Sequence, residues 1–216
     1  METEETVQQI REEAKKYFEE ACPSHDWSHV ERVYDLCNII GEKEKAEMFI
    51  LKLAALLHDI GRKKEMENPI ELDHAIISAE LALGILKKHN IDEESINKVI
   101  HCISSHRFRK EIKPETKEAR ILFDADKLDS IGAIGVARAY AWAGNKSIKL
   151  YSDKNYLGDG YEKEHSPLTE FLYKLSKVKD SLFTETARKI AEQRHQFMAS
   201  FFTQLKQEID SSQLCL

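Results

Sequence analysis

At 216 residues the chain is long enough for one large domain or two small ones, and a single helical domain of this size buries an ample core. Hydrophobic residues make up 42% and charged residues 32%, a balance that excludes a disordered chain. The formal net charge of −6 argues against non-specific nucleic-acid binding, which needs an excess of Lys and Arg. No apolar run suits a signal peptide or a membrane span, so we expect a cytoplasmic protein without a membrane partner.

The predicted elements are helices throughout, because eight glycines and four prolines are too few for a turn-rich β-protein. The first amphipathic helix covers residues 4–20 and stops before Pro23. A second helix is capped by Ser24 or Asp26 and is expected to end at Gly41.

Residues 46–59 are apolar on most faces, which predicts a helix at the centre of the fold, closed by Gly61. Residues 62–69, with the sequence RKKEMENP, are expected to form a polar loop. Asp73 and Asp92 then each cap a following helix with regularly spaced apolar residues.

Residues 118–144 are helical in propensity and rich in Ala and Gly, which favours close helix–helix contact. The composition shifts to Gly, Asp, Tyr and Lys in a long loop at about 144–167, and two helices follow near 168–179 and 184–209. No internal repeat and no alternating strand pattern interrupts this series, so we expect an all-α fold.

His58 and Asp59 stand at the end of the apolar central helix. A carboxylate there faces the negative end of the helix dipole, and burying it without a partner costs more again. A divalent cation held between the imidazole and the carboxylate removes both penalties. The alternative is that Asp59 begins a polar turn and His58 caps carbonyl groups.

His29 lies one turn into the second helix, where its side chain can reach a neighbouring helix. Asp26, three residues earlier, suits either an N-cap or a partner that holds a metal-binding histidine. Further along, Asp126 shares a helical face with Leu122 if residues 119–131 are helical, and Asp129 lies one turn beyond. A carboxylate in register with core leucines is expected to be paired or metal-bound, the alternative being an exposed acidic stripe.

Together, His29, His58, Asp59 and Asp126 make a metal site of two nitrogens and two oxygens. Such a mixed donor set suits Mn²⁺ best, with Co²⁺, Ni²⁺ and Fe²⁺ as alternatives. Mg²⁺ generally takes fewer nitrogen ligands, and Zn²⁺ favours four-coordinate sites.

The ordered set His29 … His58-Asp59 … Asp126 resembles the H…HD…D signature of the HD superfamily of metal-dependent phosphohydrolases. The likeness continues through SHDWSHVERV, AALLHDIGR, DHAIISAELA and ILFDADKLDSIGAIGVARA, and covers roughly residues 20–205. The resemblance implies one all-α domain over residues 1–216, a helical bundle with its metal-binding core at about 20–140. The same stretches resemble a branch of small HD hydrolases that includes nucleoside triphosphate pyrophosphohydrolases.

The sequence departs from some HD nucleotidases, which carry a Glu three residues after the HD aspartate; here that position is Arg62. Substrate and general-base assignments from those enzymes therefore do not transfer. Other HD proteins hold two metals with extra histidines, for which His74, His101 and His106 are candidates here. The alternative for these three is that each packs in the core or orients a metal ligand without binding the metal itself.

The expected chemistry is hydrolysis of a phosphoanhydride or phosphoester by a metal-activated water. The candidate catalytic groups are Asp59, Asp129 and Asp26. The candidate phosphate-binding groups are Arg62, Lys63, Lys127 and Arg107. For Arg62, Lys63 and Arg107 the alternative is a solvated surface charge.

The expected partner is a small phosphorylated substrate, a nucleotide above all, bound by a monomer or a homodimer. Tyr151, Tyr156 and Tyr161 in the long loop can close over a base or simply pack on the domain. The alternative functions are a phosphodiesterase for a cyclic or signalling nucleotide, and a non-catalytic module that senses nucleotides or metals.

Overall fold

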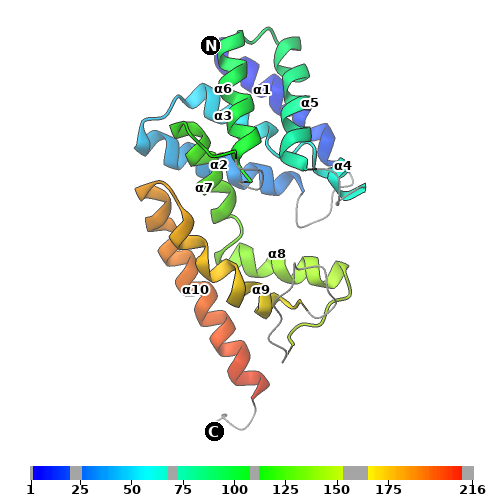
Figure 1. The fold of residues 1–216 in the computed structure, drawn as a ribbon, viewed down its shortest axis with the longest axis vertical. Coiled ribbons are helices and arrows are strands. Elements are labelled where there is room, and N and C mark those ends of the chain that lie inside the picture. The colour runs from blue at the N-terminus through cyan, green and yellow to red at the C-terminus, as the bar shows by residue number, and fades with distance from the viewer. Residues whose placement is uncertain (1, 20–25, 68–72, 108–111, 153–164, 211–216) are drawn as a thin grey trace. The chain divides into compact units, whose positions relative to one another are not determined.

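The structure, a computed structural model, describes residues 2–19, 26–67, 73–107, 112–152 and 165–210. Within these ranges every regular element is a helix, which confirms the predicted all-α fold (Figure 1). Contacts divide the chain into two compact units, residues 1–126 and 127–216, and each is described by itself. In the described part of the chain no helix is both long and apolar enough to cross a membrane.

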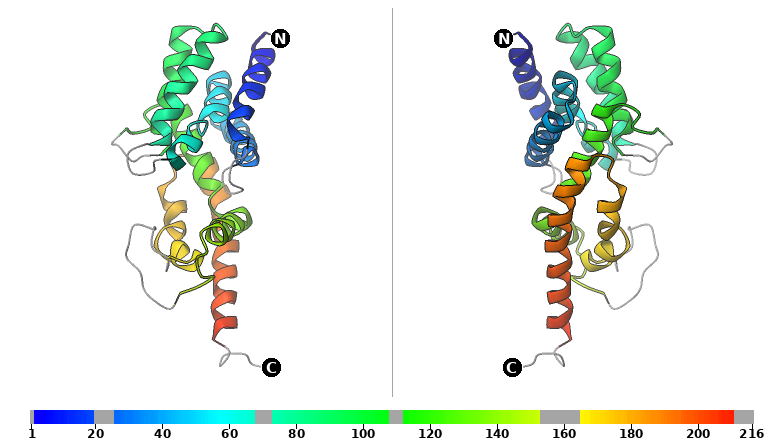
Figure 2. Two further views of the ribbon diagram at one scale, coloured as in Figure 1. Left: turned by 90° about the vertical axis from the view of Figure 1, so that its right-hand side faces the viewer. Right: turned by 90° about the vertical axis from the view of Figure 1, so that its left-hand side faces the viewer.

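The first unit is built around a short central helix. Its elements in order are α1 (Glu2–Lys15), the 3-10 turn η1 (Lys16–Phe18), α2 (Trp27–Glu44), α3 (Met48–Leu57), α4 (Arg62–Glu67), α5 (His74–Lys88), α6 (Glu93–Ser105) and α7 (Lys117–Leu128). Helix α3 packs against α1, α2 and α6, while α5 lies beside α6 and α4 beside α5 (Figures 1 and 2). The prediction of a central helix at 46–59 is thus confirmed, because α3 is buried along almost its whole length.

The expected end of α2 at Gly41 is wrong. The helix continues to Glu44 and ends with Lys45 in the left-handed conformation, at φ 55°. A side chain on Gly41 would place its Cβ 2.6 Å from Leu51 Cδ2 and 2.8 Å from Met48 Sδ. This glycine therefore lets α3 approach α2 closely instead of ending the helix.

The expected polar loop at 62–69 is also wrong over its described part, because residues 62–67 form α4. Good helix formers fill this stretch, and Glu65 within it contacts His74 and Arg107, which lie well beyond α4 along the chain. Gly61, just before α4, packs tightly on α5: a Cβ there would lie 2.7 Å from Ser78 N. Residues 68 and 69 lie outside the described part of the chain.

The predicted caps of α2, α5 and α6 are confirmed. Asp26 accepts a hydrogen bond from His29 N, Asp73 from Ala75 N and Asp92 from Ser95 N. Each carboxylate satisfies a backbone donor that the first helical turn leaves without a partner. These caps settle where α2 and α5 begin and hence how His29 and His74 project from them.

The Ala- and Gly-rich stretch 118–144 forms two helices and not one. Helix α7 ends at Leu128, and α8 (Gly132–Asn145) begins after the intervening residues 129–131, with its first residue, Gly132, at φ +80°. Asp129 therefore lies outside α7, and the expectation that it continues the helical face of Asp126 is wrong. A left-handed residue cannot continue an α-helix, and glycine adopts that conformation without steric cost.

The second unit contains α8, α9 (Pro167–Tyr173), the 3-10 segment η2 (Leu175–Ser181) and the long α10 (Glu185–Ile209). Helix α10 packs against α8 and η2, and Thr184 caps it by accepting from Ala187 N. The two predicted C-terminal helices are thus confirmed, although the first ends in 3-10 geometry. Much of the predicted 144–167 loop, with Tyr156 and Tyr161, lies outside the described residues; Tyr151 is exposed.

Candidate metal centre

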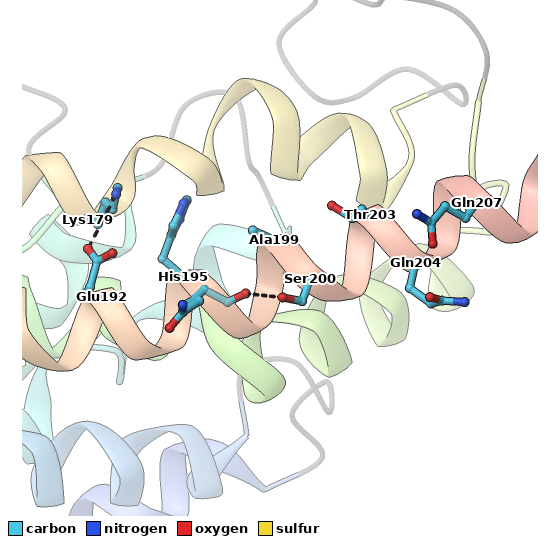
Figure 3. Close-up of a pocket in the computed structure, with 9 residues that line it drawn as sticks. Lys179, Glu192, His195, Ala199, Ser200, Thr203, Gln204 and Gln207 are labelled. Atoms are coloured by element: carbon cyan, nitrogen blue, oxygen red, sulfur yellow. Dashed lines mark hydrogen bonds and ion pairs between the residues drawn. The ribbon is translucent and has the colours of Figure 1, made fainter. Parts of the chain in front are cut away.

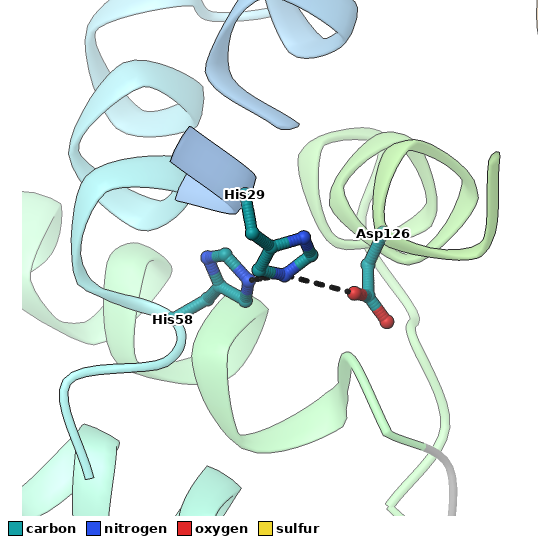
Figure 4. Close-up of side chains that lie close together, drawn as sticks. All are labelled: His29, His58 and Asp126. Atoms are coloured by element: carbon teal, nitrogen blue, oxygen red, sulfur yellow. Dashed lines mark hydrogen bonds and ion pairs between the residues drawn. The ribbon is translucent and has the colours of Figure 1, made fainter. Parts of the chain in front are cut away.

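Polar side chains on or next to three helices of the first unit meet in its interior. His29 projects from α2, His58 and Asp59 follow α3, and Asp126 lies in the last turn of α7. His29, His58 and Asp59 are almost completely buried. Figure 4 shows the two imidazole rings and the carboxylate of Asp126 converging on a common point.

The donor atoms of these residues lie close to one another. His29 Nε2 is 3.4 Å from His58 Nε2, 3.5 Å from Asp59 Oδ2 and 3.6 Å from Asp126 Oδ1. His58 Nε2 is 3.8 Å from Asp59 Oδ2. Metal–donor bonds of about 2.0–2.2 Å put neighbouring donors roughly 3.0–3.5 Å apart, close to these distances. The structure thus brings together all four residues that the sequence nominated as metal ligands.

The ring of His58 is held in the tautomer that a metal ligand needs. Its Nδ1 lies 2.8 Å from the carbonyl oxygen of Ala55, which can only accept, so Nδ1 carries the proton. Nε2 therefore presents a lone pair to the cluster. Burial lowers the pKa of His58 to about 4, so the ring is neutral at pH 7.

A second group of donors meets the other oxygen of Asp59. His74 Nε2 lies 3.2 Å and His106 Nε2 3.7 Å from Asp59 Oδ1. The two rings approach each other at 3.2 Å between their Nε2 atoms, and Nδ1 of His106 donates to the carbonyl oxygen of Ile103. Asp59 thus faces two sets of imidazoles, one with each oxygen.

The surroundings of Asp59 Oδ1 indicate whether the cluster suits a cation. This oxygen is buried and accepts no hydrogen bond, although such atoms are almost always satisfied. Burial disfavours the charged form of Asp59, but Arg62 and the neighbouring imidazoles still hold its pKa well below the usual range. A charged oxygen facing nitrogen donors is suited to a divalent ion. The residues present therefore fit a metal.

The predicted phosphate-binding residues differ in their partners and in their exposure. Arg62 donates to Asp59 Oδ2 from Nε at 3.2 Å and from Nη2 at 3.0 Å, beside the proposed ligands. Arg107 pairs with Glu65 and lies 3.5 Å from Asp73. Lys63 is exposed and lines a separate pocket with Lys16 and Lys64. Lys127 follows Asp126 in α7 and is half-buried.

The candidate general bases also differ in their surroundings. Asp59 belongs to the cluster. Asp26 caps α2 and accepts a hydrogen bond from Ser28 Oγ. Asp129 lies in the second unit, fully buried, with Oδ2 2.8 Å from Arg138 Nη1.

Sequence reasoning missed Glu65, which lay inside the expected loop. Its carboxylate contacts His74, Arg62 and Arg107. Burial opposes ionisation, but hydrogen bonds from His74 and Arg107 lower the pKa of Glu65 to about 2. The spacing of Arg62 and Glu65, three residues apart, was the available signal, because it places the two side chains on one helical face.

His101, a candidate for a second metal site, accepts a hydrogen bond from Glu115 N at its Nε2.

A separate shallow pocket runs along α10 in the second unit (Figure 3). Its lining is largely neutral and polar, with one histidine, His195, and one ion pair between Lys179 and Glu192. None of the candidate site residues lines it. The buried cluster of the first unit is therefore the stronger candidate for chemistry.

Comparisons with known proteins converge on one family. Residues 26–131 match the HD domain, a range that contains all four proposed ligands. The chain is 39% identical over 207 residues to the Bacillus subtilis protein YpgQ, a match covering 94% of this chain and 93% of YpgQ. The crystal structure of YpgQ in complex with ADP is similar over 96% of this chain and 97% of its own, with a TM-score of 0.77 and 35% identity.

Two further solved structures carry the family name in their descriptions. An HD-superfamily hydrolase from Bacillus thuringiensis is 29% identical, with a TM-score of 0.75 and coverage of 96% of this chain and 98% of its own. A predicted HD-superfamily hydrolase from an uncultured Thermotogales bacterium is 31% identical, with a TM-score of 0.64 and coverage of 94% and 90%.

Proposed function

The chain belongs to the HD superfamily of metal-dependent hydrolases, and from that premise we propose that it hydrolyses a phosphoanhydride or phosphoester bond of a nucleotide. The observation that carries the proposal is the convergence of His29, His58 and Asp126, with Asp59 Oδ2 3.5 Å from His29 Nε2 and 3.8 Å from His58 Nε2. ADP in the crystal structure of YpgQ supports a nucleotide as the substrate class.

The four residues of that cluster would hold a divalent cation through two imidazole nitrogens and two carboxylate oxygens. Mn²⁺ is the ion that we propose, because the donor set is of intermediate hardness. When bound, such an ion makes water more acidic and withdraws electrons from a phosphoryl oxygen. The protein contributes the positions: α2, α3 and α7 hold the donors before substrate arrives.

We extend the proposal to a second ion between Asp59, His74 and His106. Asp59 Oδ1 lacks a hydrogen bond and faces both Nε2 atoms, so the same carboxylate can serve both ions. Burial lowers the pKa of His74 to about 4, which keeps that ring neutral and able to bind metal at pH 7.

Arg62 is the proposed phosphate contact with the best position. Three of its five N–H groups engage Asp59 and Glu65, and its side chain is 20% exposed, so further donors can reach an anionic oxygen. Lys127, Lys63 and Arg107 remain proposed contacts for the outer phosphates. Arg107 is paired with Glu65, which restricts its movement toward a phosphate.

For proton transfer we propose that Asp59 accepts from the attacking water, since it lies within the donor cluster. Asp129 and Asp26 remain proposed alternatives. Their existing contacts, an ion pair with Arg138 and a helix cap respectively, argue for structural roles. Replacing each by Asn separates the three. Asp59→Asn should lower both kcat and Mn²⁺ affinity, because Asp59 is also a proposed ligand. At Asp129 or Asp26, a loss of kcat with unchanged Mn²⁺ affinity and unchanged stability would identify that residue as the base.

The test is a nucleotide panel with purified protein and Mn²⁺, in which pyrophosphate, orthophosphate and nucleoside monophosphates are measured separately. We expect pyrophosphate from nucleoside triphosphates and no turnover by His58→Ala. Ring-opened monophosphate from a cyclic nucleotide would make the protein a phosphodiesterase. A Mn²⁺-loaded protein that binds nucleotides without turning them over would overturn hydrolysis and favour the sensing module.

A further inference from the structure

Glu65 lies at the centre of a buried polar network that the proposed chemistry does not yet use. It belongs to α4 and is 8% exposed. Its Oε2 lies 2.9 Å from His74 Nδ1 and 3.4 Å from Arg62 Nη1, and its Oε1 accepts from Arg107. One carboxylate therefore contacts three side chains, two of which contact Asp59.

The first of these contacts decides which nitrogen of His74 carries the proton. With the proton on Nδ1, the ring donates to Glu65 and presents a lone pair to Asp59 Oδ1. With the proton on Nε2, the ring would instead donate to Asp59 Oδ1, 3.2 Å away, and Nδ1 would accept from Arg107 Nη1 at 3.0 Å. The second arrangement would block the nitrogen that faces the cluster, and the Glu65 carboxylate opposes it by accepting from Nδ1–H.

The second contact acts on the other side of Asp59. Arg62 bridges Glu65 and Asp59: Nη1 reaches Glu65, while Nε and Nη2 reach Asp59 Oδ2. Glu65 therefore holds a neighbour of each oxygen of Asp59, His74 beside Oδ1 and Arg62 beside Oδ2. This arrangement restrains rotation of the carboxylate shared by the two donor sets.

Glu65, Asp73 and His74 also lie close enough together to resemble a metal site of their own. Arg107 Nη1, however, already contacts Glu65 and lies 3.5 Å from Asp73 Oδ1. A guanidinium group supplies the positive charge there, which favours a positioning role for Glu65 over direct binding of an ion.

We propose that Glu65 is a positioning residue that holds His74 in its Nδ1–H tautomer and Arg62 against Asp59, so that Asp59 presents both oxygens to divalent ions. The proposal rests on the proposed metal centre, but it does not require a particular substrate. Residues that orient metal ligands in this way typically change metal affinity by about 10–100-fold when they are replaced.

The experiment compares the wild-type protein with Glu65→Leu and Glu65→Gln. Leu removes both the charge and the acceptor, whereas Gln keeps an acceptor and removes the charge. Glu13→Gln is the matched control, because Glu13 also pairs with a histidine and a cation, His89 and Lys88, away from the cluster. Long-range ¹H–¹⁵N spectra of the metal-free proteins report the tautomer of His74, and calorimetric titration with Mn²⁺ reports the affinity.

We expect Nδ1–H in the wild type and in Glu13→Gln, and a shift to Nε2–H in Glu65→Leu. Mn²⁺ affinity is expected to fall about tenfold or more in Glu65→Leu and several-fold in Glu65→Gln. If Glu65→Leu does not fold, the same two readouts on Glu65→Gln decide. Nε2–H in the wild type, or a Mn²⁺ affinity in the Glu65 variants equal to that of Glu13→Gln, would overturn the proposal. A wild type that binds Mn²⁺ but hydrolyses no nucleotide would contradict the proposed function alone.

Discussion

Asp59 and Asp129 are both buried aspartates next to an arginine, yet their surroundings differ. Asp129 Oδ2 meets Arg138 at 2.8 Å, and the same guanidinium also donates to the Asp129 carbonyl oxygen. Asp59 meets Arg62 with one oxygen only, while its other oxygen faces His74 and His106 and accepts no hydrogen bond. A buried carboxylate therefore indicates a metal centre only when nitrogen donors surround it; an arginine that satisfies it indicates an ion pair.

The difference between Asp59 and Asp129 is tested most strongly by removing a nitrogen donor from the proposed metal cluster around Asp59. His58→Ala is expected to lower kcat by about 1000-fold or more, because the ion loses a nitrogen ligand and the activation of water depends on it. Turnover of a nucleotide and Mn²⁺ titration measure the effect on the same preparation. Activity within tenfold of wild type would show that the cluster is not the site of chemistry.

For the second aspartate, Arg138→Met is expected to reduce the free energy of unfolding by roughly 3 kcal/mol, because it removes the guanidinium 2.8 Å from the buried carboxylate of Asp129. Denaturant unfolding measures this loss. Affinity for Mn²⁺ should stay within about twofold of wild type, since neither residue is a proposed metal ligand. A parallel loss of metal affinity would place Asp129 within the centre.

The metal-free protein should lose stability in acid because of its buried imidazoles. The pKa values of His58 and His74 are about 4 when folded, against 6.5 for an ordinary histidine. Between these values the unfolded chain binds more protons, so the free energy of unfolding falls as the pH drops from about 6.5 to 4, by up to about 3 kcal/mol per ring.

Thermal unfolding of chelator-treated protein across that pH range measures this loss, and saturating Mn²⁺ should reduce it, because an ion competes with protons for the rings. His58→Gln in the metal-free protein should flatten the curve. Stability that is constant between pH 6.5 and 4 would contradict the burial of neutral rings.

Arg62→Lys tests the geometry of the contact with Asp59, because it keeps the positive charge and removes the planar guanidinium group. We expect kcat/KM to fall about tenfold, since a lysine cannot contact Asp59, Glu65 and a phosphate together. Steady-state kinetics measure the change, and the spectroscopically monitored fold should not change. Full activity would show that Arg62 acts only as a diffuse charge.

The smallest expected effect belongs to Lys63→Ala. The residue is exposed, so we expect KM to rise by no more than about threefold and kcat to stay unchanged. Lys16→Ala, in the same pocket, is the matched control. A rise of tenfold or more confined to Lys63 would move it to the group of direct phosphate contacts.

Much of the fold could be predicted because its signals are local. The apolar run that became α3 and the caps Asp26, Asp73 and Asp92 act within one helical turn, so the residue order carries them. The predictions were wrong where a contact between residues far apart in the sequence outweighed the local signal. Gly41 indicated a helix end from sequence, but the approach of α3 gives it another role.

The four proposed metal ligands could be nominated from the sequence, through the ordered H…HD…D pattern and the cost of burying Asp59. The sequence by itself determined the residue types and the helical series that carries them. Only the tertiary structure decided that His74 and His106 share Asp59, that Glu65 joins them, and that Asp129 pairs with Arg138. The physical reason is that these contacts join side chains from different helices, and their distances depend on how the helices pack and not on the spacing of residues along the chain.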